Sequence, residues 1–398
     1  MMEIIRNLAR RKLRSVLTIS GIVIGIFALT TMGALAARFN QQLEGGVQYY
    51  GSSIQVGVPD GQLVALLPLS KMATIASVNG VDAVFPTYSF LLKPGSGFSF
   101  GGAPESIVNR IPEQTPREQP PTSIAQGRDL SPIASGEVVL GSKLAIEFRK
   151  HIGDTIDLPV KPASARPEFV NHTFTVVGIL NPTGTAPDGF ALVTTPDARM
   201  LLADSLPQLI QNSVDLSQVA PEFTVYGKPA ASIGQLDEIA RQINHQVPGV
   251  KATEPSVPVN GFKQFAALFT TITTGAALLA LIIGGLSVVN TMIMAVSERV
   301  REIGLKKAVG AHTGDLLREY LMEAGLIGLI GGVLGYLLGV GLTELINASS
   351  GASPLFLITP TLTILVIGFA VVLASLAGVL PALRAARLDP VTALRTSN

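Results

Sequence analysis

The side chains best suited to specific recognition chemistry lie in the segment 298–323, which joins two long apolar stretches of the chain. This segment carries five acidic and five basic residues: Glu298, Glu302, Asp315, Glu319 and Glu323 against Arg299, Arg301, Lys306, Lys307 and Arg318. A connection that only turns the chain needs a few residues. Opposite charges at helical spacing instead stabilise short helices. The segment therefore predicts two amphipathic helices around a break, as a docking surface needs.

Local signals place these two helices. Glu302 and Lys306 form a favourable i,i+4 pair, and Gly310 is a natural helix end. Thr313 can cap a second helix that has Asp315 in its first turn. One interpretation is an ordinary solvated loop with helical charge pairs. The other is a short helix that seats in the cleft of another protein and passes movement to the membrane.

The second interpretation names a set of contact residues. They are Glu298, Arg301, Glu302, Ile303, Gly304, Leu305, Lys306, Lys307, Gly310 and Ala311. Ile303 and Leu305 are expected to fill the cleft of the partner. Replacing Ile303 with aspartate is then expected to abolish the transfer of movement from this partner, while the protein still inserts into the membrane and dimerises.

Catalytic and metal-binding residues form no recognisable pattern. The chain has no cysteine, which excludes thiolate catalysis and Cys-ligated metals. Its four histidines share no metal-ligand spacing. The sequence has no Gly-x-x-x-x-Gly-Lys-Ser/Thr phosphate loop, so we expect it to hydrolyse no ATP by that chemistry. We predict no catalytic, cofactor or metal site in the chain, and the net charge of +1 gives no general field for nucleic acid.

Four apolar stretches are long enough to cross a bilayer, which takes about 20 residues. They are 15–37, 264–297, 324–343 and 359–383, in a chain that is 47% hydrophobic and only 14% charged. The second stretch exceeds the length of a span, so its helix is expected to begin as a stalk near 261–265. A cleaved signal peptide is the alternative for the first stretch, although its apolar run is longer than the usual one of about 7–15 residues.

The distribution of Lys and Arg predicts the orientation of these spans. Basic residues gather in 1–14, 298–323 and 384–398, and none lies in 344–358. The positive-inside rule then places both termini and the charged segment in the cytosol, and 38–263 and 344–358 outside. Residues 1–14 are expected to be an amphipathic basic helix on the inner membrane surface or a plain basic flank.

The region between the first two spans, 38–263, is predicted to be a large α+β domain. Its two ends share an order of strand, helix and strand, at 53–58, 69–78 and 80–88 and again at 222–226, 232–246 and 249–253. We expect 38–93 and 215–263 to form one membrane-proximal β-α-β subdomain. Residues 94–214 are expected to be a distal, mostly β insert, with strands at 137–140, 155–158, 172–180 and 190–194, a helix near 142–150 and a long loop at 94–121.

Glycine spacing indicates where the spans approach each other closely. Gly331, Gly335 and Gly339 recur every fourth residue in the third span, and Gly21 and Gly25 do so in the first. Such faces favour close helix contact, either within one chain or in a dimer. The cores of the spans carry no ionisable residue, which argues against an ion-coupled carrier.

Several parts of the chain resemble known permeases. The run EIGLKKAVGA at 302–311 and the tail LPALRAARLDPVTALR at 380–395 resemble the FtsX-type permease domain of ABC transporters. The start, LRSVLTISGIVIGI at 13–26, resembles the first span of MacB-type permeases. The runs GRDL at 127–130, VVLG at 138–141, IGD at 152–154 and FTVVGIL at 174–180 are similar to the MacB-type extracytoplasmic domain.

This resemblance implies a membrane α-helical fold, with one transmembrane helix before and three after an inserted α+β extracytoplasmic domain. It implies a homodimer in the bacterial inner or plasma membrane, in which the 298–311 helix couples to an ATPase that holds ATP and Mg. MacB-type proteins carry that ATPase ahead of the first span, whereas here it is expected to be a separate polypeptide.

The resemblance also implies a function. ATP-driven closure of the dimer would move the outer domain, which is mechanotransmission rather than passage of substrate between the membrane helices. Export of a drug, a peptide or a similar substrate is the predicted role, with an extracytoplasmic adaptor or substrate protein as a further partner. The alternatives are an FtsX-like signalling scaffold that activates an outer partner and a lipoprotein-release permease.

Overall fold

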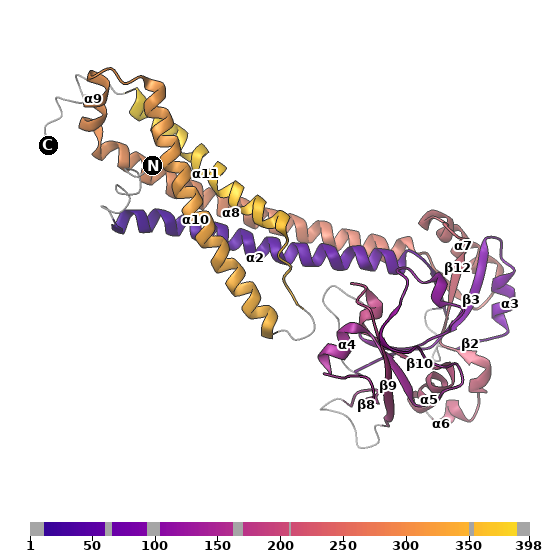
Figure 1. Cartoon of the computed structure of the whole chain (residues 1–398). Coiled ribbons are helices and arrows are strands. Elements are labelled where there is room, and N and C mark those ends of the chain that lie inside the picture. Colours follow the sequence, from indigo (N-terminus) through magenta and orange to yellow (C-terminus); the bar gives the residue numbers. More distant parts are fainter. Residues whose placement is uncertain are drawn as a thin grey trace. The chain divides into compact units, whose positions relative to one another are not determined.

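The computed structural model describes residues 12–59, 66–93, 104–161, 170–206, 208–349 and 354–387. These residues divide into two compact units (Figure 1). The helical unit contains the described residues up to 38, those of 268–350 and those from 354 on, and the α/β unit contains the described residues of 39–267. The expected basic helix at 1–14 and the tail at 384–398 lie mostly outside the described residues.

Four helices of the described chain are long and apolar enough to cross a membrane. They are α2 (Lys12–Tyr50), α8 (Ser256–Glu298), α10 (Thr313–Ser349) and α11 (Pro360–Ala386). The short helix α9 (Val300–Ala308) lies between α8 and α10. The predicted fold class, with one such helix before an inserted α+β domain and three after it, is confirmed.

Two of these helices are longer than hydropathy alone indicates. Helix α2 continues past the predicted end of its span at 37, and α8 begins before the predicted stalk. Aromatic rings join the two extensions within the α/β unit. The ring centroids of Phe39 and Phe265 are 5.2 Å apart, and those of Tyr50 and Phe262 are 5.6 Å apart. Hydropathy marks where a helix leaves the bilayer, whereas these ring contacts stabilise the helices beyond that point.

Glycine lets the helices of the helical unit touch within one chain. A Cβ added to Gly331, Gly335 or Gly339 of α10 would lie within 2.8 Å of an atom of α2. A Cβ added to Gly21 or Gly25 of α2 would lie within 3.0 Å of an atom of α8. All five glycines are therefore packing positions within one chain, which is the first of the two alternatives.

The smaller sheet of the α/β unit brings both ends of its sequence together. Its order is β13-β1-β12-β3, and all neighbours are antiparallel. The sheet and its helices comprise β1 (Ile54–Gly57), α3 (Lys71–Ala76), β3 (Val81–Thr87), β12 (Glu222–Gly227), α7 (Ile233–Gln246) and β13 (Lys251–Thr253). Gly80 and Gly249 join a helix to the next strand with φ of +92° and +71°. Glycine adopts this left-handed backbone without steric cost.

The larger sheet has the order β4-β5-β10-β7-β9-β6, with β8 paired to β9. Its strands are β4 (Ser89–Leu91), β5 (Ser106–Asn109), β6 (Ile124–Gly127), β7 (Glu137–Leu140), β8 (Thr155–Leu158), β9 (His172–Leu180) and β10 (Phe190–Val193). The pairs β5–β10 and β7–β9 are parallel. The remaining elements are β2 (Leu67–Pro68), η1 (Thr115–Arg117), α4 (Ser142–Glu147), η2 (Ala186–Gly189), α5 (Thr195–Ser205), α6 (Gln208–Gln211), η3 (Leu216–Gln218) and β11 (Val219–Ala220).

Strand β5 corrects the expectation of one long loop at 94–121. The described part of that segment, 104–121, contains β5 and the 3₁₀ helix η1. β5 is only four residues long and lies between prolines, so its local sequence favours a loop. Its parallel pairing with β10, far along the chain, makes it a strand.

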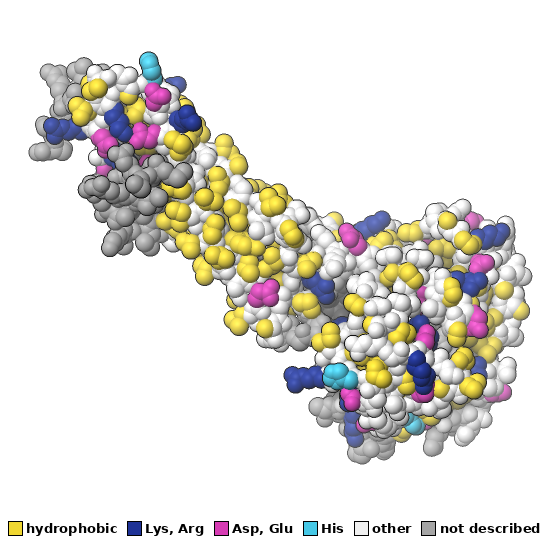
Figure 2. All heavy atoms as spheres, viewed as in Figure 1, with side chains coloured by type: hydrophobic (Ala, Val, Ile, Leu, Met, Phe, Trp, Pro, Cys, Tyr) yellow, Lys and Arg dark blue, Asp and Glu magenta, His cyan; other side chains and the backbone are white. Residues whose placement is uncertain are grey.

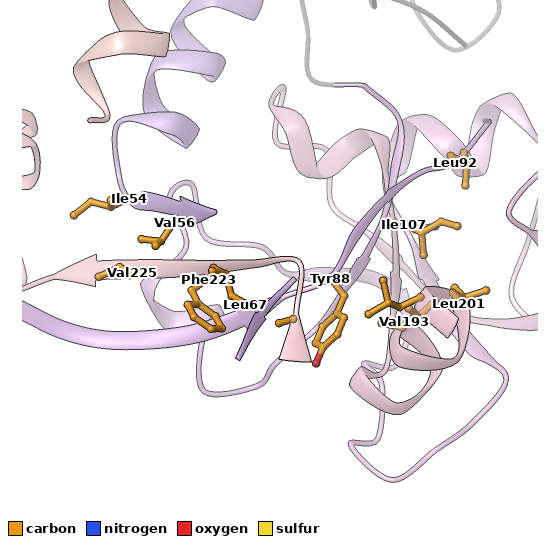
Figure 3. Close-up of a cluster of buried hydrophobic side chains, with 14 of the residues drawn as sticks. Ile54, Val56, Leu67, Tyr88, Leu92, Ile107, Val193, Leu201, Phe223 and Val225 are labelled. Atoms are coloured by element: carbon orange, nitrogen blue, oxygen red, sulfur yellow. The ribbon is translucent and has the colours of Figure 1, made fainter. Parts of the chain in front are cut away.

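One hydrophobic core runs through both sheets (Figure 3). It joins Ile54 and Phe223 of the smaller sheet to Ile107 of the larger one. Tyr88, between β3 and β4, is fully buried, and its hydroxyl donates a hydrogen bond to the Val219 carbonyl at 2.8 Å. The two sheets therefore form one folding unit.

Candidate coupling surface

Helix α9 is a separate short helix with a defined end. Gly310, two residues beyond it, has a φ of +101°. The N–H of Gly310 donates to the Lys307 carbonyl at 3.0 Å, and the N–H of Ala311 donates to the Lys306 carbonyl at 3.0 Å. These two bonds form a Schellman motif, which needs a left-handed residue at the position of Gly310. The helix end predicted at Gly310 is confirmed.

The second helix starts one residue away from the expected cap. Helix α10 begins at Thr313, and the carbonyl of His312 accepts hydrogen bonds from the N–H groups of Asp315 and Leu316 at 3.1 and 3.4 Å. His312, rather than Thr313, is therefore the capping residue. Asp315 lies in the first turn as predicted, where a negative charge favours the helix dipole.

The two apolar residues of α9 point in different directions. Ile303 is 1% exposed and belongs to a buried cluster with residues of α10 and α11, whereas Leu305 is 58% exposed. Side chains two positions apart in a helix cannot share a face. The expectation that both fill the cleft of a partner is therefore wrong for Ile303. Val309, which directly follows α9, is 83% exposed and shares the outward side with Leu305.

The seat that receives Ile303 is formed by small and apolar side chains. Its buried members from α10 and α11 are Leu316, Tyr320, Ala324, Ala382, Ala385 and Ala386. Alanines on α11 leave room for α9 to approach closely, because they carry no side chain beyond Cβ. Leu316, Tyr320 and Ala324 of α10 thus face inward, in the same buried cluster as Ile303.

Ion pairs between helices also hold α9 in its seat. Arg299 Nη1 lies 3.4 Å from Glu323 Oε2, and the side chain of Glu323 is only 8% exposed. Lys306 Nζ lies 2.8 Å from Glu319 Oε1 on α10 but 3.8 Å from Glu302. The expected Glu302–Lys306 pair is therefore the looser of the two contacts of Lys306. Sequence spacing predicts pairs within a helix, whereas the pairing between α9 and α10 depends on the turn between them.

The predicted contact residues occupy three levels of burial. Ile303 and Gly304 are buried, Lys306, Lys307 and Ala311 are half-buried, and Glu298, Arg301, Glu302, Leu305 and Gly310 are exposed. The end of α11 adds the exposed Arg384 and Arg387. Figure 2 shows acidic and basic side chains gathered at the α9 end of the helical unit, next to the hydrophobic surface of the spans. The outward side of α9 is thus an apolar pair, Leu305 and Val309, surrounded by both signs of charge.

Such a surface is suited to protein contact rather than to catalysis. Exposed apolar side chains ringed by charges are a usual composition for an interface. In the described part of the chain, no group of three or more His, Cys, Asp or Glu side chains is arranged to hold a metal ion.

Two family models match the chain. The model described as MacB-like periplasmic core domain matches residues 15–246, and the model described as FtsX-like permease C-terminal matches residues 274–390. The first match covers α2 and most of the α/β unit, and the second covers most of α8 and α9 to α11.

Related proteins match over almost the whole chain. An uncharacterized ABC transporter permease of Methanocaldococcus jannaschii is 26% identical, over 98% of this chain and 96% of its own length. The uncharacterized ABC transporter permease YknZ of Bacillus subtilis is 24% identical, over 96% of this chain and 95% of its own. The macrolide export ATP-binding/permease protein MacB of Agrobacterium fabrum is 26% identical over 96% of this chain, which spans only 58% of that protein.

Proposed function

Since the chain belongs to the ABC transporter permeases with a MacB-like periplasmic core domain and an FtsX-like permease C-terminal domain, we propose that it couples a separate ATPase to movement of its α/β unit. In this proposal α9 and both termini face the cytosol and the α/β unit lies outside. The concentration of Lys and Arg at the α9 end supports this orientation. ATP and Mg would bind to the ATPase.

The observation that carries the proposal is that one side of α9 packs on the helical unit while its other side is exposed. One side is fixed to the helical unit by the buried Ile303 and by the Arg299–Glu323 ion pair. The other side presents Leu305 and Val309 to solvent. A helix held in this way transfers a push on its outer side to the whole bundle, because packed interiors deform little.

The route from the bundle to the α/β unit is continuous backbone. Helix α2 runs unbroken through residue 38, and α8 runs unbroken through residue 267, where the two units divide. In this proposal, movement passes from the helical unit to the α/β unit along these two helices. This favours mechanotransmission over passage of substrate between the membrane helices.

Export is the transport direction that we propose, with a drug or a peptide as the substrate. The support is the match to relatives that are named macrolide export proteins, which extends through the α/β unit. An extracytoplasmic adaptor or substrate protein would be a further partner.

Replacing Leu305 or Val309 with glutamate should separate the chain from its ATPase. The measurement is the amount of ATPase that co-purifies with each variant, and the ATP turnover of the complex in lipid. We expect at least a tenfold loss of association, because a charge replaces the apolar centre of the contact. Both side chains are exposed, so thermal unfolding should be unchanged.

A matched control is Ile133→Glu in the α/β unit. Ile133 is 93% exposed, so the same chemical change is made away from α9. ATPase association equal to wild type in both the Leu305 and Val309 variants would refute the proposed contact.

We also propose that two copies of the chain associate along α8. One face of α8 is exposed along its length, at Leu268, Thr271, Gly275, Leu279, Ile282, Leu286, Asn290 and Ile293. Within this otherwise apolar face, Asn290 presents an amide and Gly275 leaves a notch with no atom near it. An amide that faces lipid is unfavourable, whereas a second Asn290 across a dimer can pair with it.

Cysteine cross-linking tests this dimer sharply, because the native chain has no cysteine. A single Asn290→Cys variant in membranes should form a disulfide-linked dimer on oxidation. The control is Leu376→Cys on α11, a 66% exposed position outside the proposed interface. Efficient cross-linking at 376 with none at 290 would place the interface elsewhere.

A further inference from the structure

A cavity of about 310 Å³ lies between the two sheets of the α/β unit. Its walls come from the C-terminal end of α2, from β1, β3 and β12 of the smaller sheet, from β5 and β10 of the larger sheet, and from the segment around η1. This volume is at the lower end of the range for small-molecule sites. No part of the coupling surface contributes to it.

Contacts between neighbouring elements hold the walls of this cavity in place. Gln114 Nε2 donates to the Tyr226 hydroxyl at 3.2 Å. The rings of Tyr49 and Phe190 meet edge to face, with their centroids 5.9 Å apart. A preformed cavity of this kind binds a ligand without the cost of ordering its walls.

Four aromatic residues belong to the lining. Tyr49 and Tyr50 end α2, Tyr226 lies on β12, and Phe190 lies on β10. The faces of such rings carry negative partial charge and attract cations.

Two carboxylates lie in the same lining. Glu222 on β12 forms no ion pair with any residue that the structure describes. Glu118 accepts a hydrogen bond from the Thr122 hydroxyl at 2.8 Å. The one basic residue of the lining is Arg110.

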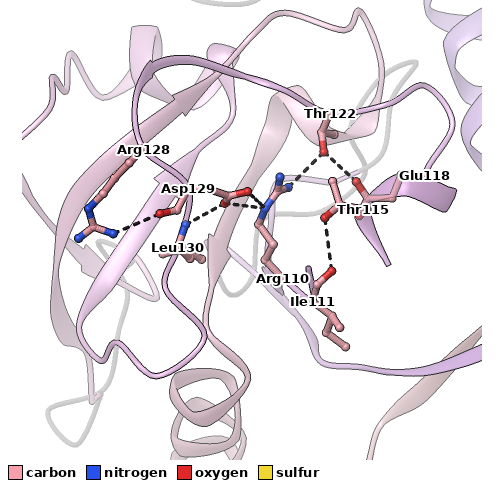
Figure 4. A network of polar contacts seen from close by, with 8 residues as sticks. All are labelled: Arg110, Ile111, Thr115, Glu118, Thr122, Arg128, Asp129 and Leu130. Atoms are coloured by element: carbon pink, nitrogen blue, oxygen red, sulfur yellow. Dashed lines mark hydrogen bonds and ion pairs between the residues drawn. The ribbon is translucent and has the colours of Figure 1, made fainter. Parts of the chain in front are cut away.

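Arg110 forms an ion pair with Asp129 and reaches Glu118 only through the Thr122 hydroxyl. Its Nε lies 2.7 Å from an oxygen of Asp129, and its Nη1 donates to the Thr122 hydroxyl at 3.1 Å (Figure 4). Asp129 therefore balances Arg110, and the two glutamates leave the cavity with excess negative charge.

We propose that this cavity binds an organic cation, a protonated amine or a quaternary ammonium ion with an apolar body. The rings of Tyr49, Tyr50 and Tyr226 would contact the apolar body and the face of the charge. Glu118 and Glu222 would supply the counter-charge. This inference goes beyond the proposed coupling function and does not rest on it, because binding here requires no ATPase.

The titration of the two glutamates agrees with this assignment. Loss of water around the carboxylate raises the pKa of Glu222, and the same effect raises the pKa of Glu118. For Glu118, the Thr122 hydrogen bond and Arg110 oppose the rise, and Asp129 adds to it. A bound cation favours the ionised carboxylates, so its affinity should increase as the pH rises through these raised pKa values.

The test uses the full chain in nanodiscs of zwitterionic lipid, with empty nanodiscs as the blank. The probes are benzyltrimethylammonium, the neutral benzyl alcohol and the anionic phenylacetate. Tyrosine fluorescence reports binding, because the chain has no tryptophan and three of its six tyrosines line the cavity. We expect benzyltrimethylammonium to bind at least about tenfold more tightly than the other two probes.

Matched variants locate that binding. Glu222→Gln and Glu118→Gln should each weaken the cation by about tenfold, whereas Glu254→Gln should stay within twofold of wild type. Glu254 is the control because it lies outside the lining and pairs with Arg241 at 3.2 Å. No detectable cation binding, equal binding of the three probes, or unchanged affinity in both cavity variants would overturn the proposal.

Thermal unfolding of Glu222→Gln shows whether the variant is folded. It also measures how ionisation of the Glu222 carboxylate changes the stability of the protein. A carboxyl whose folded pKa is raised binds more protons in the folded state, so wild-type stability falls as the pH rises above the ordinary value of 4.5. Glu222→Gln removes this loss. Its Tm should therefore exceed that of wild type at pH 7, and the difference should close at pH 4.

Discussion

Replacing Gly335 with leucine is expected to destabilise the helical unit by about 3 kcal/mol or more, because overpacking a tight helix contact forces the backbones apart. A Cβ at this position would lie 2.7 Å from the Val23 carbonyl oxygen and 2.9 Å from Ile26 Cβ. The carbonyl belongs to the backbone of α2 and cannot rotate away. The contacts of Gly331 and Gly339 on either side would then open as well. The measurement is the Tm of the solubilised chain, together with the amount of folded protein in the membrane.

The same helix offers a matched control in Gly341→Leu. A Cβ at Gly341 meets no atom within 4 Å, so the added side chain extends into open space. The control should be stabilised by up to about 1 kcal/mol, because leucine favours a helix more than glycine does. Equal stability of the two variants would contradict the close contact of α10 with α2.

The helical unit could be predicted well from the sequence because its signals are local. A charge-free apolar run marks a membrane helix wherever it packs, and the glycine spacing marks a close helix contact. The same signals could not assign a partner to each glycine. That Gly331 meets α2 of its own chain depends on how four helices fold back on one another.

The α/β unit could be predicted less completely, because its strands pair with partners that are distant in sequence. The strands that the sequence predicted are those with continuous apolar runs, such as β9 and β10, whereas β5 was missed because its partner β10 is distant in sequence. The cavity could not be predicted for the same reason. Its lining joins Tyr49, Glu118 and Glu222, and no spacing rule connects residues so far apart in the chain.

The faces of α9 show why a charged helix is easier to find than to orient. Charge spacing and Gly310 predict where the helix runs and ends. Which apolar residue faces inward depends on the alanines of α11, which approach only in the folded chain. From sequence alone, Ile303 and Leu305 were therefore both predicted to contact the partner, whereas the structure buries Ile303 and exposes Leu305.

Replacing Ile303 with aspartate is accordingly expected to destabilise the α9 end by about 4 kcal/mol or more, because it empties an apolar site and buries an unpaired carboxylate there. Ile303 is 1% exposed. The measurements are the Tm of the full chain and the rate of tryptic cleavage at Lys306 and Lys307, which should rise sharply as α9 detaches. Ile303→Val should cost no more than about 1.5 kcal/mol and keep ATPase association.

The comparison with Leu305→Glu decides between the two faces of α9. If α9 is seated through Ile303, the aspartate variant loses stability first and ATPase association as a consequence, whereas the Leu305 variant loses association alone. If Ile303→Asp instead keeps the wild-type Tm and protease resistance but no longer binds the ATPase, then Ile303 contacts the ATPase directly. That result would reverse the orientation of α9, and the Arg299–Glu323 pair would have to break for the helix to turn.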